Sequence, residues 1–172
     1  MPAPTAVTPE FDTIATKVKE HIEAITNPPK VYLRQRGKHF WDEVMSNQVI
    51  ASQLNVWEIT FENMNTIIPV EGGGTGNLPL RERTYQVMLT GRLAFRDGSD
   101  TDNSTLQFNH AIESIENKLI TDYFLKGGTD TATLLKPIIR VDARVNDFIM
   151  YGSVLVHFCE MVFMAKVRKQ GL

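Results

Sequence analysis

The chain has 172 residues, of which 42% are hydrophobic and 22% are charged, and this size and composition favour a single globular domain. Its formal net charge of −2 argues against a protein devoted to wrapping nucleic acid, because such proteins carry a strong positive excess. The single cysteine, Cys159, excludes a disulfide within the chain and fits a reducing compartment.

Neither end of the chain reads as a targeting or membrane segment. Residues 1–8 lack the basic and apolar stretches of a secretory signal, and we expect them to form a flexible arm before a single domain at 9–172. The apolar run at 151–172 falls short of the ~20 residues that a spanning helix needs, and His157 and Glu160 interrupt it. We therefore predict a soluble protein that is made in the cytoplasm.

The first predicted element is an amphipathic helix. Thr8-Pro9-Glu10 supplies a hydroxyl cap, a proline at the first helical position and an acid in the first turn. Asn27-Pro28-Pro29 ends the helix, because the residue before a proline is pushed out of the helical region. The apolar residues recur at spacings of three and four: Phe11, Ile14, Val18, Ile22 and Ile25.

Two strands and two less regular stretches follow. A short strand is predicted at 31–36, and residues 39–54 fit either a helix or a packed loop. The alternation at 55–64 predicts a strand with a wet or contact-making second face. Residues 65–80 form a long connector whose three consecutive glycines need outside contacts to hold one path, so we expect a mobile contact loop. In the strand at 55–64, one face carries Trp57, Ile59 and Phe61, and the opposite face carries Glu58, Thr60 and Glu62.

The second half of the chain predicts a long strand, a helix and two more strands. The strand at 83–95 places Tyr85 and Leu89 among the apolar residues of one face and Gln86 and Arg92 on the other, with Met88. A polar turn at 96–105 leads into a helix from about Ser104 to Leu125, and 137–147 alternates again. The apolar stripe of this helix is Phe108, Ile112, Ile115, Leu119 and Tyr123.

The last strand, which ends near residue 167, is mostly apolar on both alternating faces. An ordinary half-exposed strand is apolar on one face only. The order of elements predicts an α+β fold, with two amphipathic helices packed on a mostly antiparallel sheet. Two helices do not easily cover both faces of so long a strand. Either the sheet folds over to cover its second face, or another copy of the protein covers that face. The two sets are Val154, Val156, Phe158, Val162 and Met164 against Leu155, Cys159, Met161 and Phe163.

Two loops resemble ligand sites without matching them. The glycines at 71–76 suggest a phosphate loop, yet no Gly-Lys-Ser/Thr follows them and the chain continues into a strand rather than a helix. The acidic turn at 97–104 lacks the Asp-x-Asp-x-Asp-Gly spacing of a calcium loop, and Phe108 occupies its twelfth position. A flexible contact loop explains the glycines better than a phosphate site, and a turn with a helix cap accounts for the acidic residues, so we assign no cofactor and no metal.

His157 and Cys159 share a strand face and are therefore candidate zinc ligands, although no second pair has matching spacing. Core packing explains them more simply, because free cysteine behaves as a small apolar residue. Ser153 with His157 resembles a nucleophile–base pair but lacks a Gly-x-Ser-x-Gly turn. No group of residues reaches the level of a catalytic site, so we predict that the chain is not an enzyme.

The order of elements from about residue 10 to 167 resembles the tail terminator (tail completion) proteins of tailed bacteriophages. The segments that carry the resemblance are the long strand "RTYQVMLTGRLAF", the helix "NHAIESIENKLI" and the closing strand "YGSVLVHFCEMVF", with an acidic turn and a further strand between them. The resemblance lies in element order rather than in a short motif.

The resemblance implies a virion structural protein at the head-proximal end of the tail. Such subunits form a hexameric ring that caps the tail tube, stops its growth and provides the docking surface for the head connector. In contractile tails the ring also contacts the sheath, and DNA passes through the lumen without being read. Two alternatives remain: another neck or head-completion protein of the head–tail junction, and a small α+β enzyme or ligand-binding domain near Ser153, His157 and Cys159.

Under this resemblance two groups of residues are candidates for protein contacts. The polar face of the long strand is expected to meet the lumen or an adjacent subunit, and the glycine loop is expected to become ordered on the tube or the connector. Ordering that loop costs conformational entropy, which suits a contact formed once in a multivalent assembly. The candidate interface residues are Glu71, Gly72, Gly73, Gly74, Glu82, Thr84, Gln86 and Arg92.

Overall fold

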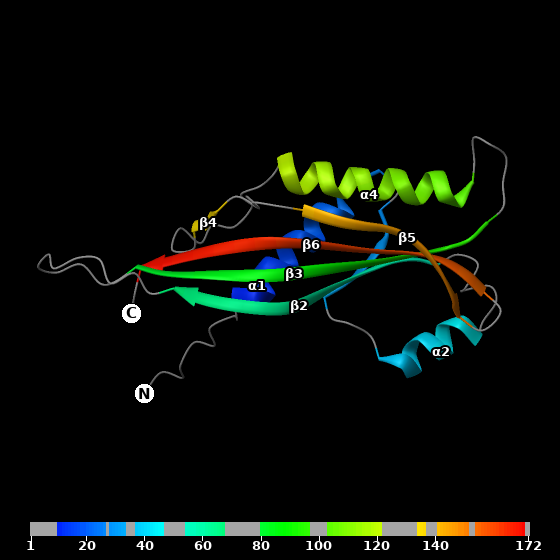
Figure 1. Ribbon diagram of the computed structural model, residues 1–172, viewed down its shortest axis with the longest axis horizontal. Coiled ribbons are helices and arrows are strands. Elements are labelled where there is room, and N and C mark those ends of the chain that lie inside the picture. The colour runs from blue at the N-terminus through cyan, green and yellow to red at the C-terminus, as the bar shows by residue number, and fades with distance from the viewer. Residues whose placement is uncertain are drawn as a thin grey trace, which may run out of the picture.

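The alternating segments of the sequence pair side by side in one mixed, mostly antiparallel sheet, with helices packed on it (Figure 1). This confirms the predicted α+β class. The computed structural model describes residues 10–26, 28–33, 37–46, 54–67, 80–96, 103–121, 134–136, 141–151 and 154–170. The elements in chain order are α1 (Glu10–Glu23), β1 (Lys30–Tyr32), α2 (Lys38–Ser46), β2 (Asn55–Ile67), β3 (Leu80–Ala94), α4 (Ser104–Thr121), β4 (Leu134–Lys136), β5 (Val141–Tyr151) and β6 (Val154–Gln170).

The long strand β3 lies at the centre of the sheet. It pairs antiparallel with β2 on one side and with β6 on the other, each over almost its whole length. The short strand β1 adds to β2 in parallel, and β4 and β5 pair antiparallel with different ends of β6. The strand order is therefore β1-β2-β3-β6, followed by β5 and β4 along the same edge of β6.

Helices α1 and α4 cover one face of the sheet, which we call the helix face. Figure 1 shows α1 behind the strands and α4 running along them beside β5. The described residues of both predicted stripes point into the core beneath these helices, and Tyr123 lies outside the described residues. Each large apolar side chain buried there contributes roughly 1.5–3 kcal/mol. None of the helices in the described ranges is both long and apolar enough to cross a membrane. The core includes Ile14, Val18, Ile22, Trp57, Ile59, Val87, Leu89, Phe108, Ile112, Ile115, Leu119, Met161 and Phe163.

Side-chain hydrogen bonds fasten the first turn of α1 to the sheet. The Tyr85 hydroxyl donates to the Glu10 carboxylate at 2.7 Å, and Arg83 donates to the same oxygen at 2.9 Å. Both partners come from the helix face of β3, so one carboxylate connects the helix start to the central strand. Burial of the ring raises the pKa of Tyr85, which keeps its hydroxyl protonated as the donor.

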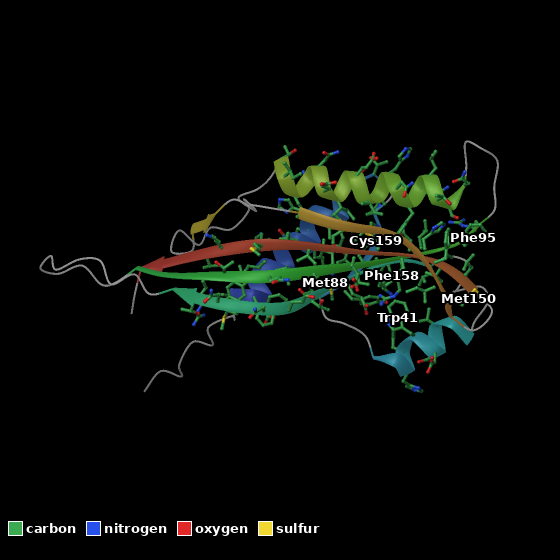
Figure 2. All side chains as sticks on the ribbon, in the orientation of Figure 1. Trp41, Met88, Phe95, Met150, Phe158 and Cys159 are labelled. Atoms are coloured by element: carbon green, nitrogen blue, oxygen red, sulfur yellow. The ribbon has the colours of Figure 1, made fainter. Side chains whose placement is uncertain are left out.

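The stretch 39–54, which fits helix or loop by its sequence, contains the helix α2. The prediction of two helices was therefore incomplete. Trp41 of α2 packs against the second face of the sheet at one end and builds a separate small core there. Figure 2 shows Trp41 reaching from α2 towards Phe158. The buried members of this core are Trp41, Leu54, Val56, Ala94 and Val156.

The strands differ from their predicted bounds in ways that change side-chain placement. Strand β2 runs on to Ile67, and a bulge between Phe61 and Asn63 shifts its register. Phe61, which pairs with Val87 just before this bulge, is 44% exposed, although Trp57 and Ile59 on the same face are fully buried. Of the predicted strand at 137–147, residues 141–147 belong to β5, which extends to Tyr151, and residues 137–140 lie outside the described residues. The short strand β4 before them was not predicted.

The two apolar faces of β6 have different environments. Cys159, Met161 and Phe163 lie in the main core beneath the helices. On the other face Val156 is covered by the small core of α2, whereas Met164 further along is 42% exposed. In the described part of the chain, helices therefore cover the helix face of the sheet and one end of its second face.

Candidate functional site

Part of the second sheet face lies beyond α2, and we call it the open face. Its side chains line up across three strands, since Thr60 pairs with Met88 and Met88 pairs with Val162. The described helices leave these side chains half-buried or exposed. Figure 2 shows Met88 towards the middle of the sheet, away from α2. The open face consists of Thr60, Thr84, Gln86, Met88, Val162 and Met164.

Polar groups on and beside the open face are held by neighbouring strands. The Gln86 amide donates to the Glu62 carboxylate at 2.5 Å, and the Thr60 hydroxyl donates to the Met88 carbonyl at 3.4 Å. These bonds fix the side chains of β2 and β3 without burying them. Methionine together with satisfied polar groups is typical of a protein interface rather than of a catalytic cleft.

The predicted interface residues are divided between different places. Thr84 and Gln86 lie together on the open face and are half-buried. The backbone of Glu82 continues the same strand, opposite Ile67 and Arg168. Arg92 lies apart from them, because it is buried beneath α2. The four predicted residues of the glycine loop, Glu71, Gly72, Gly73 and Gly74, lie outside the described residues.

Arg92 forms an ion pair with Glu58 inside the small core of α2. The guanidinium lies 2.5 Å from the carboxylate, and Glu58 is fully buried. The Trp41 ring covers the guanidinium at 4.4 Å and Phe158 lies at 5.6 Å. A buried carboxylate must be paired, because an isolated charge costs several kcal/mol in a low-dielectric interior. The second face of β2, which was predicted to be wet or to make contacts, therefore contacts Arg92 of the same chain through Glu58.

A serine and a histidine lie in contact, but the serine is not the one that the sequence suggested. Ser104 at the start of α4 lies 2.8 Å from His157 Nε2, whereas Ser153 lies outside the described residues. Both side chains are 1% exposed, and burial lowers the pKa of His157. The Ser104 hydroxyl also accepts from the Arg96 backbone N–H at 2.8 Å and donates to its carbonyl at 2.9 Å. This arrangement connects the end of β3 with the start of α4 and buries both side chains.

Cys159 is fully buried in the main core, as its predicted packing role requires. Burial raises the pKa of its thiol to about 12, with a smaller contribution from Glu160. The thiol therefore stays protonated at neutral pH and is neither a metal ligand nor a nucleophile in that form. Within the described ranges no three His, Cys, Asp or Glu side chains gather in a way that would hold a metal ion.

Exposed apolar side chains gather at the two sides of the sheet, which the sequence did not indicate. On the β5 side, Phe148 is 50% and Met150 is 59% exposed, and Phe148 contacts Phe95 with ring centroids 5.8 Å apart. On the β2 side, Phe61 and Met64 are each 44% exposed. Figure 2 shows Phe95 and Met150 at the same end of the molecule. Alternation alone cannot identify these residues, because exposure depends on which strand lies at the edge.

A hollow of about 570 Å³ lies between the end of α1, the start of β2, the end of β3 and α4. Arg96 and His110 are the basic groups in its wall, and Phe108 and Leu93 supply apolar surface. The other described lining residues are Thr26, Asn55, Gln107, Ala111 and Ser114, so the described part of the wall contains no carboxylate.

Comparison with known proteins adds no family assignment. The chain matches no protein-family model, and no curated protein matches it.

Proposed function

We propose that this chain is a ring-forming structural subunit of a tailed bacteriophage, the tail terminator that caps the tail tube and receives the head connector. The observation that carries the proposal is the partly covered sheet: a long antiparallel sheet has one face under α1 and α4, and its open face holds Met88, Val162 and Met164. Surface of this kind is typical of a protein that associates with other protein.

The order of elements supports the same assignment. A helix, two strands, a long strand, a helix and the closing strands β5 and β6 follow one another as in the family that the sequence resembles, and the short strand β4 is an addition before β5. Helix α2 is an addition to that order, and it covers only one end of the second face.

In this proposal copies of the chain form a hexameric ring at the end of the tube. The ring stops tube growth, offers its other side to the connector and, in contractile tails, meets the sheath. DNA passes through without sequence recognition. Thr84 and Gln86 of the open face, with Glu82 and the loop Glu71–Gly74, remain our candidates for these contacts.

The enclosure of the Ser104–His157 pair and of Cys159 gives no support to an enzymatic role, because each is at most 1% exposed. Another neck or head-completion role is separated from the terminator role by position. A label on this chain in assembled particles lies next to the tube in the first case and next to the portal in the second.

Electron microscopy of tail tubes mixed with the purified chain tests the proposal. We expect a ring at one end of each tube and an arrest of further tube growth. Met164→Glu on the open face should weaken tube-end binding at least tenfold. Ile120→Glu, a change at a comparably exposed apolar residue of α4, should not. Wild-type chain that leaves tube ends bare and growth unaffected contradicts the proposal.

A further inference from the structure

Within the part of the chain that the structure describes, the outer edges of the sheet are unpaired along much of their length. On one side β1 pairs only with Val56–Glu58 of β2, so among the described strands none pairs with the outer side of Ile59–Ile67. On the other side β5 pairs with β6 through Val141–Tyr151, and no described strand pairs with its outer side. Unpaired edges of this length are templates for another strand.

The directions of the strands make these two edges complementary. From β2 through β3 and β6 to β5, every neighbouring pair is antiparallel. The outer strands β2 and β5 therefore run in opposite directions. If a second copy is rotated about an axis roughly along the strands, its β5 lies antiparallel to β2 of the first copy. Such a head-to-tail contact uses two different surfaces and generates a closed ring when the rotation closes.

Exposed apolar side chains lie on the matching side of both edges. Phe61 and Met64 of β2 pair with Val87 and Tyr85, which point to the helix face. Phe148 of β5 pairs with His157, whose ring packs on Phe108 of α4, so it also points to the helix face.

Met150 of β5, two residues beyond Phe148, lies on the same side. Rotation keeps the helix faces of neighbouring copies on one side. The apolar side chains of the two edges therefore meet across the junction.

Both edge strands also carry a β-bulge, between Phe61 and Asn63 in β2 and between Val145 and Asp147 in β5. Bulges interrupt regular pairing and are a known protection against promiscuous edge association. Because β1 already occupies the start of β2, the incoming strand has to be offset along the strand direction. Such an offset is what a sheet with tilted strands requires as it closes.

We propose that copies of this chain join edge to edge, with β5 of one copy pairing antiparallel with the Ile59–Ile67 stretch of β2 in the next. The junction is sealed on the helix face by Phe61 and Met64 from one copy and Phe148 and Met150 from its neighbour. This deepens the proposed function by naming the contact between subunits, and it rests on that function only in requiring that copies assemble.

Two variants that each block one edge test the head-to-tail character of the contact. Met64→Lys blocks the β2 edge and Met150→Lys blocks the β5 edge, and both side chains are exposed enough to change without loss of the fold. Light scattering should show each variant alone at the mass of the 19.4 kDa chain, while an equimolar mixture forms a dimer and nothing larger. Ile120→Lys should assemble like the wild type.

The outcomes decide the proposal. Single variants that assemble like the wild type overturn it, and so does a mixture that stays monomeric or a wild-type chain that never associates. Should a lysine variant fail to fold, judged by circular dichroism, cysteine cross-linking replaces it, because the native Cys159 is buried.

A chain with both Met64→Cys and Met150→Cys should give a ladder of covalent multimers on oxidation, and each single change should give none. Absence of the ladder overturns the contact, whereas tube-end binding by the wild type tests the proposed function separately.

Discussion

At the scale of single residues, Gly91 shows how closely the main core is packed. A Cβ at this position would lie 2.6 Å from Cζ2 of Trp57, whose indole crosses β3 on the helix face. The backbone has to approach the ring this closely because Trp57 is fully buried between the sheet and Phe108 of α4.

Gly91→Ala should therefore destabilise the fold by about 1–3 kcal/mol, the usual cost of overpacking a core. Urea unfolding followed by tryptophan fluorescence measures it. Gly37, before α2, has no atom within 4 Å of its would-be Cβ, so Gly37→Ala is the control and should cost less. Equal effects of the two changes would contradict the close approach.

His157 should make stability depend on pH. Burial lowers its pKa in the folded state, whereas in the unfolded chain it is close to ~6.5. The unfolded state thus binds more protons below that pH, so the contribution of His157 is present above about pH 6.5 and is lost as the pH falls. The difference in unfolding free energy between pH 7.5 and 5.5 should be larger for wild type than for His157→Phe. An identical difference would show that His157 does not remain neutral in the fold.

At the scale of elements, α2 is stabilised by apolar packing and also shields a charge pair. Trp41 covers the guanidinium of Arg92, which neutralises the buried Glu58. The pair thereby connects α2 on the second face with β2 and with β3, which comes much later in the chain. Separating these partners removes the positive charge that faces the buried carboxylate of Glu58.

Arg92→Met should cost about 3–5 kcal/mol, because Glu58 is then buried without its cation. The double change Glu58→Met with Arg92→Met should recover most of this loss, since it removes both charges and keeps apolar volume. Unfolding free energies of the single and double variants measure the coupling. A double variant as unstable as the single one would mean that the pair stabilises the fold by more than charge compensation.

At the scale of the whole molecule, the sheet combines covered and uncovered surface. In the described part of the chain, the helix face is covered by α1 and α4, the second face is covered at one end by α2, and the open face and the strand edges are left uncovered. The proposed association of copies would involve the folded chain only, so it would add to the stability of the fold by mass action.

The midpoint of thermal unfolding should therefore rise with protein concentration for the wild type and for Ile120→Lys. It should stay constant for Met64→Lys, whose β2 edge is blocked. Differential scanning calorimetry over a hundredfold range of concentration is the measurement. A wild-type midpoint that does not change with concentration would argue against assembly of the folded chain.

The local sequence pattern was enough to predict the elements whose apolar periodicity matches the face that is buried in the fold. The stripes of α1 and α4 and the alternation of β2, β3 and β6 predicted these elements and most of their core residues, because a helix or a strand under a continuous core repeats its apolar side chains at a fixed spacing. The two-sided apolar pattern of β6 likewise indicated that both faces make contacts, and α2 provides one of them.

The α+β class, the helices α1 and α4 and the long strands can be derived from the sequence, since these depend on neighbours a few residues apart. The three-dimensional arrangement was needed to show that Arg92 is buried under Trp41 and that His157 contacts Ser104. It was also needed to show which apolar side chains are exposed: Phe61, Met64, Phe148 and Met150. These outcomes depend on strand order, register and bulges, which bring together residues far apart in the chain. The spacing of residues along the chain does not indicate which strand will lie at an edge of the sheet.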